Sequence, residues 1–388
     1  MRTIGVATVA RSDYGIYLPV LRAIQASPDL ELKLFVTGMH LAPEYGNTVD
    51  AIQSDGFASA QRVEMLLASD TPEAIGKSMG LGVIGFAQAF ASSRPDLLLV
   101  LGDRFEMLAV ATAALPYTLP IAHIHGGEVT QGAIDESIRH AITKMSHLHF
   151  VATEQYAARV IQMGEEPWRV TVSGAPALDL LTTIEYLDQP ALEQRLGLVL
   201  HPAPLLVTYH PVTLEYTDTA PQIASLLAAL DEVKRPIIFT YPNADTAGRT
   251  IIAAIDSFVQ THPQARVFPN LGTTAYFSLM RQAAAMVGNS SSGILEAASF
   301  GLPVVNVGTR QLGRLRGINV VDVGYSSAEI TTAINLVTGA SFRERLNGLV
   351  NPYGDGGAAT RIVDVLSTTQ LGARLVKKQF YDLAVAAR

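Results

Sequence analysis

The sequence predicts an α/β protein with two doubly wound, Rossmann-like domains and an intervening cleft. Three observations lead to this prediction. Short apolar runs typical of buried strands alternate with segments whose apolar residues recur at helical spacing. This alternation runs twice along the chain, with a polar break around residues 181–203. The chain has 388 residues, which at roughly 150 residues per domain is enough for two or three domains.

The first series of elements begins with the strand-like run TIGVATVA at residues 3–10. Helical spacing of apolar residues follows over residues 14–26 and stops at Ser27-Pro28. The segment 50–66 has no clear periodicity and predicts no single element. The other expected elements are strands at 30–38, 97–102, 120–126, 147–152 and 169–174, and helices at 72–92, 104–115, 135–146 and 154–163.

Beyond the polar, proline-containing connector, the alternation restarts with the run PLLVTYHP. The expected strands are 204–211, 235–241, 265–269, 284–289, 303–308 and 318–323, and the expected helices are 219–231, 246–261, 273–283, 292–300, 326–338, 357–369 and 371–387. These elements predict one domain over residues 1–180 and a second over 181–370. The remaining segment, 371–388, is expected to be a C-terminal helix, and this architecture allows it to cross back to the first domain.

The amino-acid composition argues against several classes of function. Hydrophobic residues make up 48% of the chain and charged residues 16%, which is typical of a folded protein with sizeable cores. The formal net charge of −7 argues against a general nucleic-acid or anionic-membrane binder, because such proteins carry a basic excess. The absence of cysteine excludes disulfides, thiolate metal sites and cysteine catalysis. The N-terminal segment is typical of a first strand rather than a signal peptide, and no charge-free apolar run of about 18 residues occurs. We therefore expect a cytoplasmic protein without a membrane span.

Carboxylates gather where consecutive strands of the first domain end. Asp103 follows the strand at 97–102, Glu128 follows the next strand, and Asp135 and Glu136 open the helix after that. Because ligands bind beyond the carboxyl ends of parallel strands, these groups are expected to share a site. Carboxylates in one dry pocket have pKa values pushed apart, so that one can act as a base and another as an acid. The alternative is that each carboxylate caps a helix or pairs with Arg104, Arg139 or Lys144. Three carboxylates at successive strand ends or helix starts nevertheless favour a role in proton transfer.

Two other turns are typical of anion sites. Arg11 and Ser12 follow the first strand, and an arginine there suits a phosphate. In the second domain, Ser290 and Ser291 open a helix whose free N–H groups could bind an anion, with Glu296 about one turn further on for ribose hydroxyls. The alternatives are ordinary helix caps, with Ser12 or Asp13 capping the first helix. No GxGxxG follows the first strand and no Walker motif occurs, which argues against a Rossmann-type NAD site and a P-loop.

The histidines divide into two groups. His123, His125, His147 and His149 alternate along strands, and a zinc site is conceivable, but packing is favoured because no HExxH spacing is present. His210 ends the first strand of the second domain, and Arg310 follows a later strand of that domain. We interpret both as donors to a phosphate or hydroxyl in the cleft.

Several motifs in fixed order resemble one enzyme family. GDRFE, HIHGGE, DESIRHAITKMSHLHF, YHP and GNSSSGILEA together are similar to the hydrolysing UDP-N-acetylglucosamine 2-epimerases of sialic acid biosynthesis. The resemblance runs in register from ARSDYG at residue 10 to GTRQLGR at residue 314. It implies the glycosyltransferase-B type of two-domain fold, release of UDP from UDP-N-acetylglucosamine, and formation of N-acetylmannosamine.

The resemblance also implies roles for residues. Asp103, Glu128, Asp135 and Glu136 would transfer protons, and Arg104 would lie near the sugar or a phosphate. The residues implied to hold UDP are Arg11, Ser12, His210, Asn243, Ser290, Ser291, Glu296 and Arg310. The implied reaction is an elimination of UDP that gives a 2-acetamidoglucal, followed by addition of water at C1 and return of a proton to C2. It needs neither a metal nor another cofactor, and the family commonly forms homodimers or homotetramers. Which carboxylate is the base and which the acid stays open.

Four alternatives remain at this point. The same motifs are compatible with the same reaction on UDP-2,4-diacetamido-2,4,6-trideoxyglucose in legionaminic acid biosynthesis. A non-hydrolysing UDP-N-acetylglucosamine 2-epimerase is the second alternative, which RSDYG, GDRFE and HIHGGE disfavour. A glycosyltransferase of the same fold is the third, and a non-catalytic nucleotide-sugar sensor is the fourth; neither would need clustered carboxylates.

Overall fold

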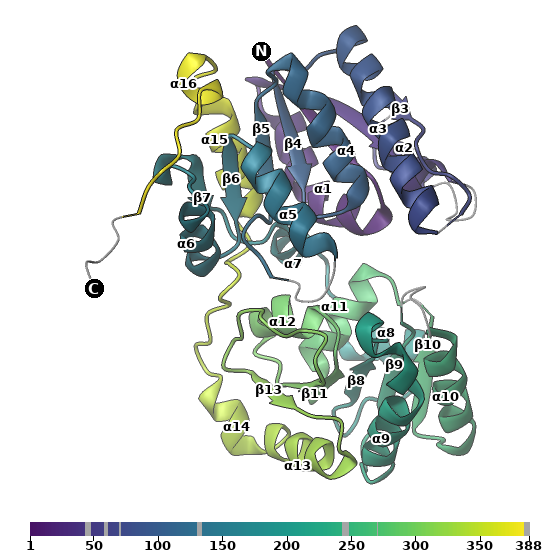
Figure 1. Ribbon diagram of the computed structural model, residues 1–388. Helices are drawn as coiled ribbons and strands as arrows, with labels where there is room; N and C mark the ends of the chain where they lie inside the picture. Colours follow the sequence, from purple (N-terminus) through teal and green to yellow (C-terminus); the bar gives the residue numbers. More distant parts are fainter. Residues whose placement is uncertain are drawn as a thin grey trace, which may run out of the picture. The chain divides into compact units, whose positions relative to one another are not determined.

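The computed structural model describes residues 1–42, 48–57, 61–69, 71–129, 134–242, 248–269 and 271–383, which form two compact units (Figure 1). The first unit comprises Met1–Leu180 and Tyr353–Arg388, and the second comprises Leu181–Pro352. Each unit contains one parallel sheet with hydrophobic cores on its two faces. The predicted α/β class with two Rossmann-like domains is therefore confirmed.

The sheet of the first unit has seven strands in the order β3-β2-β1-β4-β5-β6-β7. They are β1 (Arg2–Thr8), β2 (Leu30–Thr37), β3 (Gln61–Val63), β4 (Leu97–Leu101), β5 (Ile121–Ile124), β6 (Leu148–Val151) and β7 (Val170–Val172). Side chains alternate across the sheet, so Leu97 and Leu99 of β4 join one core while Leu98 and Val100 join the other. Strand order reverses between β1 and β4, and in such sheets the crevice at the carboxyl ends of the strands is where ligands bind.

Helices cover both faces of this sheet (Figure 1). One face packs against α1 (Arg11–Ala26), α2 (Val49–Ser54) and α15 (Ala358–Thr368), and the other against α3 (Pro72–Ser92), α4 (Phe105–Ala114) and α5 (Ile134–Met145). The remaining helices are α6 (Glu154–Gln162), α7 (Asp179–Thr183) and α16 (Ala373–Val376).

Helix α3 is the one helix among the described residues that is long and apolar enough to cross a membrane by length and composition. Core helices pass the same test, and Phe86 and Phe90 of α3 pack against Phe35 of β2 at ring-centroid distances of 6.1 and 5.6 Å. Thr71 caps the helix through its hydroxyl, which accepts a hydrogen bond from the Ala74 N–H. We therefore describe α3 as a core helix of the first unit.

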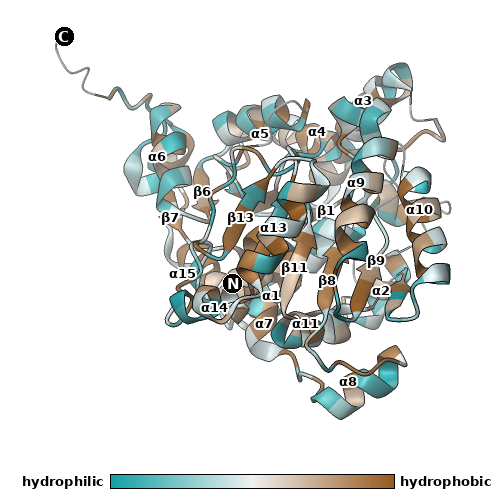
Figure 2. Cartoon of the chain, turned by 90° about the horizontal axis from the view of Figure 1, so that it is seen from below, coloured by the Kyte–Doolittle hydropathy of each residue, from teal (hydrophilic) through white to brown (hydrophobic). Residues whose placement is uncertain are grey.

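The sheet of the second unit has six strands in the order β10-β9-β8-β11-β12-β13. They are β8 (Leu205–Thr208), β9 (Ile237–Thr240), β10 (Ala265–Phe268), β11 (Ala285–Gly288), β12 (Val304–Val307) and β13 (Val320–Val323). The helices are α8 (Gln189–Leu196), α9 (Thr219–Asp231), α10 (Gly248–Thr261), α11 (Thr273–Gln282), α12 (Ser292–Leu295), α13 (Ser327–Val337) and α14 (Ala340–Arg345). Figure 2 shows β8, β9 and β11 largely in the colours of hydrophobic residues, as expected for strands covered on both faces.

Three expectations about element and domain limits are wrong. The connector at 181–203 contains α8, which Asp188 caps at its start and Gly197 ends in the left-handed conformation at φ +59°. The second domain does not extend to residue 370, because Ile362 and Leu366 of α15 lie in the same core as α1. The chain therefore rejoins the first unit at Tyr353 rather than at 371.

The expected helix at 371–387 is also wrong, since α16 ends at Val376 and residues 377–383 are not helical. Tertiary contacts replace the helix. The Arg169 guanidinium donates to the carbonyls of Leu375 at 2.8 Å and Arg374 at 3.0 Å. The Tyr381 N–H donates to the carbonyl of Gly164 at 2.9 Å, and the Phe380 ring occupies the space where a side chain at Gly164 would lie. These contacts bind α16 and the non-helical segment after it to the first unit.

Candidate active site

The predicted carboxylates lie at the carboxyl ends of β4 and β5. Gly102 has a φ of +75°, which turns the chain sharply after β4 and places Asp103 before α4. After β5 the chain turns again through Gly127 at φ +76°, where an added Cβ would lie 2.6 Å from the Tyr156 carbonyl oxygen. This turn brings Glu128 back toward the strand ends. His125 also has a left-handed conformation, at φ +66°, which is uncommon outside glycine and is found at functional turns.

Arg139 of α5 joins three of the predicted residues. Its guanidinium forms ion pairs with Asp103 and, at 2.7 Å, with Glu136, and it donates to the backbone carbonyl of Glu128 at 2.9 Å. The Arg139 side chain is only 3% exposed. Burial opposes its charge, but the carboxylates around it raise its pKa overall, so it stays cationic. Asp103 and Glu136 therefore both pair with one arginine, which brings them together, while their shared catalytic role stays a prediction.

Two of the carboxylates also contact a histidine. His125 Nδ1 lies 2.6 Å from Glu128 Oε1, and both side chains are almost buried. His140 Nε2 lies 3.3 Å from Glu136 Oε1. A carboxylate beside an imidazole can exchange a proton with it within a hydrogen bond, which suits general acid–base chemistry.

Asp135 differs from its neighbours. Burial, together with the negative charge of Asp103, raises the pKa of its carboxyl group, while Arg104 and Arg139 oppose the shift. A carboxyl group with a raised pKa holds its proton longer than an ion-paired one. The cluster thus contains both ion-paired carboxylates and one carboxyl group whose pKa is raised.

A second polar group lies at the ends of β1 and β4. Arg104 forms a bidentate ion pair with the fully buried Glu106, at 3.2 and 3.0 Å. Asp13 accepts hydrogen bonds from the N–H groups of Val9 at 3.0 Å and Ala10 at 2.5 Å, and burial raises its pKa to about 6. Ala10 is the N-cap of α1, so the expectation that Ser12 or Asp13 is the N-cap is wrong, although Asp13 at position N3 accepts the hydrogen bond of the N-cap N–H.

The exposed Arg11 and Ser12 form the first turn of α1, at the carboxyl end of β1. His40 lies deeper at the same edge, with Nε2 3.0 Å from the Thr8 hydroxyl. Burial lowers the pKa of His40 to about 4, so this imidazole is neutral. His40 is not among the residues predicted from the sequence, and Glu106 is predicted only as part of the polar cluster after the strand at 97–102, without a role of its own. Both follow strands that the sequence does reveal, so their position after a strand end is the signal that could have found them.

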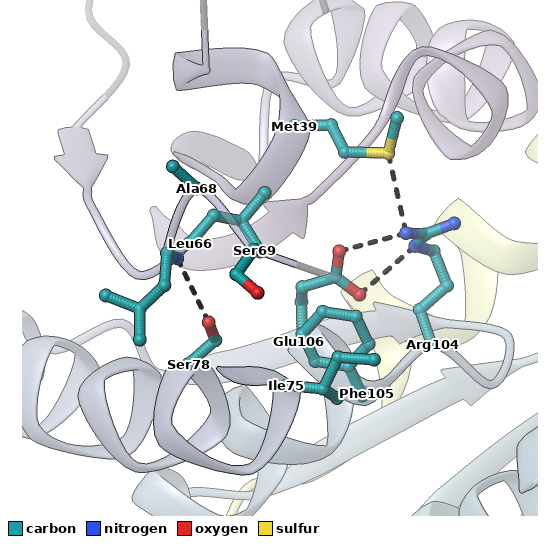
Figure 3. A pocket seen from close by; sticks show the side chains of 10 residues that line it. Met39, Leu66, Ala68, Ser69, Ile75, Ser78, Arg104, Phe105 and Glu106 are labelled. Atoms are coloured by element: carbon teal, nitrogen blue, oxygen red, sulfur yellow. Dashed lines mark hydrogen bonds and ion pairs between the residues drawn. The ribbon is translucent and has the colours of Figure 1, made fainter. Parts of the chain in front are cut away.

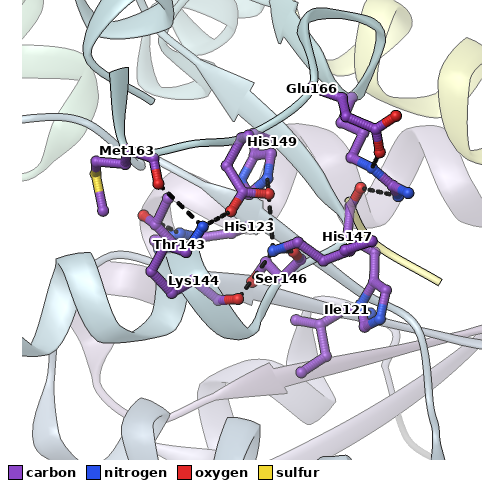
Figure 4. A network of polar contacts seen from close by, with 12 residues as sticks. Ile121, His123, Thr143, Lys144, Ser146, His147, His149, Met163 and Glu166 are labelled. Carbon is purple, nitrogen blue, oxygen red and sulfur yellow. Dashed lines mark hydrogen bonds and ion pairs between the residues drawn. The ribbon is translucent and has the colours of Figure 1, made fainter. Parts of the chain in front are cut away.

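Three of the four alternating histidines make packing contacts, as predicted. His123 Nε2 lies 2.8 Å from the Gly102 carbonyl, and His147 Nδ1 accepts a hydrogen bond from the Ile121 N–H at 3.1 Å. His149 Nε2 pairs with the buried Glu165 at 3.0 Å within the network of Figure 4. Within the described part of the chain, no group of three or more His, Asp or Glu side chains is placed to hold a metal ion.

In the second unit, the ends of β8 and β11 come very close together. Gly288 has a φ of +131°, and an added Cβ there would lie 2.0 Å from the Thr208 carbonyl oxygen. The Asn289 side chain accepts from the His210 N–H at 2.7 Å and donates to the His210 carbonyl at 2.8 Å. Arg310 donates to the Asn289 carbonyl at 3.1 Å. The strand ends thereby hold an imidazole and a guanidinium at one edge of the sheet.

His210 is neutral in this setting. Burial, and to a smaller extent the charge of Arg310, lower the pKa of its imidazole to about 3. A neutral imidazole can donate one N–H to a phosphate or hydroxyl oxygen, as the sequence predicts for this residue.

The serine-rich turn after β11 is shorter than expected. α12 is a single turn that ends at Leu295, and a 3₁₀ turn follows over Ala297–Phe300 in place of the predicted helix at 292–300. Ser291 is the N-cap but makes no capping bond with its side chain, and the Ser290 hydroxyl accepts from the Ser292 N–H at 3.3 Å. The turn therefore presents hydroxyl groups beside the ends of β8 and β11.

Glu296 is buried beneath this turn. Its Oε2 has no hydrogen-bond partner among the described residues, and burial raises the pKa of the carboxyl group to about 7. An unpaired buried acceptor is costly, which a hydroxyl-bearing ligand would relieve. Tyr276 of α11, which the sequence does not indicate, interacts through its hydroxyl with Ser292, Thr208 and Ser290. Asn243, the remaining predicted UDP ligand, lies outside the described residues.

Comparison with known proteins identifies the family. The family model described as UDP-N-acetylglucosamine 2-epimerase matches residues 22–367. The chain belongs to this family. It is 42% identical to the GDP/UDP-N,N′-diacetylbacillosamine 2-epimerase (hydrolyzing) of Campylobacter jejuni, over 83% of this chain and 84% of that protein. It is 39% identical to the UDP-N,N′-diacetylbacillosamine 2-epimerase (hydrolyzing) of Legionella pneumophila, over 97% of this chain and 99% of that protein.

The fold of the family agrees with the two units described here. The crystal structure of the UDP-GlcNAc 2-epimerase from Neisseria meningitidis bound to UDP-GlcNAc matches with a TM-score of 0.80 and 18% identity. The match covers 95% of this chain and all of that one. At this identity the likeness concerns the fold alone. Membership of an epimerase family sets the glycosyltransferase and sensor alternatives aside.

Proposed function

We propose that this chain converts UDP-2,4-diacetamido-2,4,6-trideoxyglucose, the UDP-N,N′-diacetylbacillosamine for which its relatives are named, into UDP and the 2-epimeric free sugar. It is a hydrolysing UDP-sugar 2-epimerase. The names of the relatives at 42% and 39% identity are the observation that carries the choice of sugar. They support the diacetamido sugar ahead of UDP-N-acetylglucosamine, which the sequence-based expectation ranked first. UDP-N-acetylglucosamine remains the second candidate because the family model bears its name.

The carboxylate cluster of the first unit supports a role in proton transfer. In the first stage a base removes the C2 proton, the C–H electron pair forms the C1=C2 double bond, and the C1–O bond breaks as UDP leaves with its electron pair. Ion pairs with Arg139 hold the carboxylates of Asp103 and Glu136 in place, as the position of a catalytic base requires. In the second stage water adds at C1 and C2 regains a proton on the opposite face. Asp135, with its raised pKa, and Glu128, paired with His125, suit the donor role.

The second unit supports the role of nucleotide holder. Loss of UDP places negative charge on the pyrophosphate, which the cation of Arg310 and the neutral N–H of His210 would stabilise. The hydroxyls of Ser290 and Ser291 would add donors, and the open oxygen of Glu296 would accept from the ribose. In the first unit, Arg11, Ser12 and Arg104 are proposed to bind the substrate as well. The role of Asn243 stays a prediction.

Turnover in deuterated water tests the reaction. We expect each of the two UDP-sugars that is turned over to give UDP and a free sugar that carries deuterium at C2, seen by NMR and mass spectrometry. A product without deuterium at C2 would overturn the elimination route. The ratio of kcat/KM for the two sugars then decides between the candidates, and a higher value for UDP-N-acetylglucosamine would reverse our choice.

Two further properties are proposed from the composition and from the family resemblance. We expect a cytoplasmic protein, because its composition is acidic and free of cysteine. Cell fractionation would check this location. A homodimer or homotetramer is expected from the family resemblance, and light scattering of the purified protein would measure its mass.

A further inference from the structure

A cavity of about 390 Å³ lies in the first unit beside Arg104 (Figure 3). The segments that follow β2, β3 and β4 form its walls together with the start of α3. Its lining residues are Met39, Leu66, Leu67, Ala68, Ser69, Ile75, Ser78, Arg104, Phe105 and Glu106. The volume lies within the range of roughly 300–1,000 Å³ that is usual for small-molecule sites. The cavity and the carboxylate cluster therefore share the carboxyl end of β4.

The lining is mostly apolar and carries little net charge. Leu66, Ile75 and Phe105 surround the space, and Figure 3 shows the Arg104–Glu106 ion pair at one side of it. The fully buried Glu106 offsets the charge of Arg104 at 3.0 Å. A charged ligand group would lose its hydration in this cavity and find no unpaired opposite charge on the apolar walls. The cavity therefore suits an uncharged group such as an acetamido group, which has both a methyl and an amide.

The wall is held in place by the protein itself. The Leu67 N–H donates to the buried Ser78 hydroxyl at 3.1 Å, which ties the β3–α3 loop to the helix. Helix and loop pack closely, because a Cβ added at Gly82 would lie 2.7 Å from Met65 Cε. A wall fixed in this way loses little conformational entropy when a ligand arrives. The Leu67 side chain is nevertheless 39% exposed, so it is available to cover a substituent.

The cavity adjoins the proton-transfer groups. Asp103, which pairs with Arg139, directly precedes Arg104 in the chain, and the charge of Arg104 acts on both Asp13 and Asp135. A sugar whose C2 lies at the carboxylates could therefore extend its other substituents past Arg104 into the apolar space.

We propose that this cavity receives the 4-acetamido group and the adjoining C6 methyl of the sugar, and that it selects against sugars with hydroxyls at C4 and C6. This inference rests on the proposed function. Burying a methyl in place of a hydroxymethyl group favours the diacetamido sugar, since an apolar pocket rejects an added hydroxyl by about 10²-fold in kcat/KM. Leu67 and Ile75 are then specificity-determining residues.

The test compares Leu67→Ser with Leu81→Ser. Leu81 is an equally exposed leucine of α3, at 42%, that does not line the cavity. We expect Leu67→Ser to lower kcat/KM for the diacetamido sugar nucleotide by about 10-fold or more, with less than about a 3-fold change for UDP-N-acetylglucosamine. Leu81→Ser should leave the ratio of the two values unchanged. Ile75→Thr, which keeps the branched shape, should shift the ratio in the same direction as Leu67→Ser.

The outcomes separate the two proposals. If the wild-type protein turns over neither sugar nucleotide, the proposed function fails. If it turns over only UDP-N-acetylglucosamine, or if neither Leu67→Ser nor Ile75→Thr lowers kcat/KM for the diacetamido sugar nucleotide more than Leu81→Ser does, the cavity does not select the sugar and this inference is overturned. Thermal midpoints of all variants show whether a lost activity reflects unfolding, and the ratio of two activities of the same folded variant is insensitive to such loss.

Discussion

The carboxylate cluster of the first unit differs in its electrostatics from the ends of β8 and β11 in the second unit. We call the latter the serine-rich edge, which comprises His210, Ser290, Ser291, Glu296 and Arg310. Around Arg139, opposite charges pair with each other, so Asp103 and Glu136 are held in place before any ligand arrives. At the serine-rich edge, burial instead makes groups neutral, as for His210, or leaves an acceptor open, as for Glu296. We infer from this difference that charged side chains held in place by ion pairs suit proton transfer. Neutral hydrogen-bond donors and acceptors without a protein partner suit the reversible binding of a nucleotide.

Removal of the central cation, Arg139, should have the largest effect on both activity and stability. We expect Arg139→Met to lower turnover by at least about 10⁴-fold, the upper end of the contribution of a proton-transfer group. It should also cost roughly 3–5 kcal/mol in the free energy of unfolding, because removing one partner leaves buried carboxylates without compensation. Steady-state kinetics and urea unfolding measure the two effects. Arg139→Lys is the control, which keeps the charge but cannot make the same set of contacts; full activity in Arg139→Met would contradict the role given to this residue.

A smaller effect is expected when only one carboxylate loses its charge. Glu128→Gln keeps the shape of the side chain and should reduce kcat by about 10²–10⁴-fold. UDP affinity, measured by calorimetry, should stay within a few-fold of the wild-type value. The matched control is Glu73→Gln, which changes an exposed glutamate that pairs with Lys77 at 2.5 Å. Loss of this exposed ion pair should lower the free energy of unfolding by at most about 1 kcal/mol. If UDP affinity fell as much as the rate, Glu128 would be structural.

The smallest effect concerns Glu296 and depends on pH. Burial raises its pKa from the ordinary 4.5 to about 7 in the folded protein. Between these values the unfolded chain releases the proton while the folded chain keeps it, so this group lowers stability progressively as pH rises from 4.5 to 7. The raised pKa lowers the free energy of unfolding by about 3 kcal/mol above pH 7 and does not change it below pH 4.5. Glu296→Gln should abolish this part of the pH dependence in urea unfolding.

The same titration should appear in binding. The ionised carboxylate accepts a ribose hydroxyl better than the protonated acid, so UDP affinity should rise between pH 6 and 8 by about 3- to 10-fold more in the wild-type protein than in Glu296→Gln. The variant serves as the control for titration of UDP itself. Identical pH profiles for the two proteins would show that Glu296 does not contact the nucleotide.

Much of the fold follows from local patterns. The helix at 72–92 begins and ends where the sequence predicts, because Thr71 caps it and Pro95 follows closely. The run LLLVL forms β4, and the polar residues after it lie at the strand end as expected. Where a segment packs against distant residues, local patterns fail. A helix is expected over 371–387, yet α16 ends at Val376 and residues 377–383 are not helical, while Arg169 and Gly164 contact this segment.

The sequence by itself determined that two α/β domains exist, that carboxylates follow consecutive strands, and that the chain has the motifs of a 2-epimerase family. Periodicity and strand ends are local properties, so they can be recognised without knowing which strands are neighbours. Only the tertiary structure decided that Arg139 is the shared partner of Asp103 and Glu136 and that α15 belongs to the first unit. It alone revealed the apolar cavity beside Arg104, whose walls come from three strand ends. These features depend on sheet order and on packing between residues far apart in the chain, which no local pattern records.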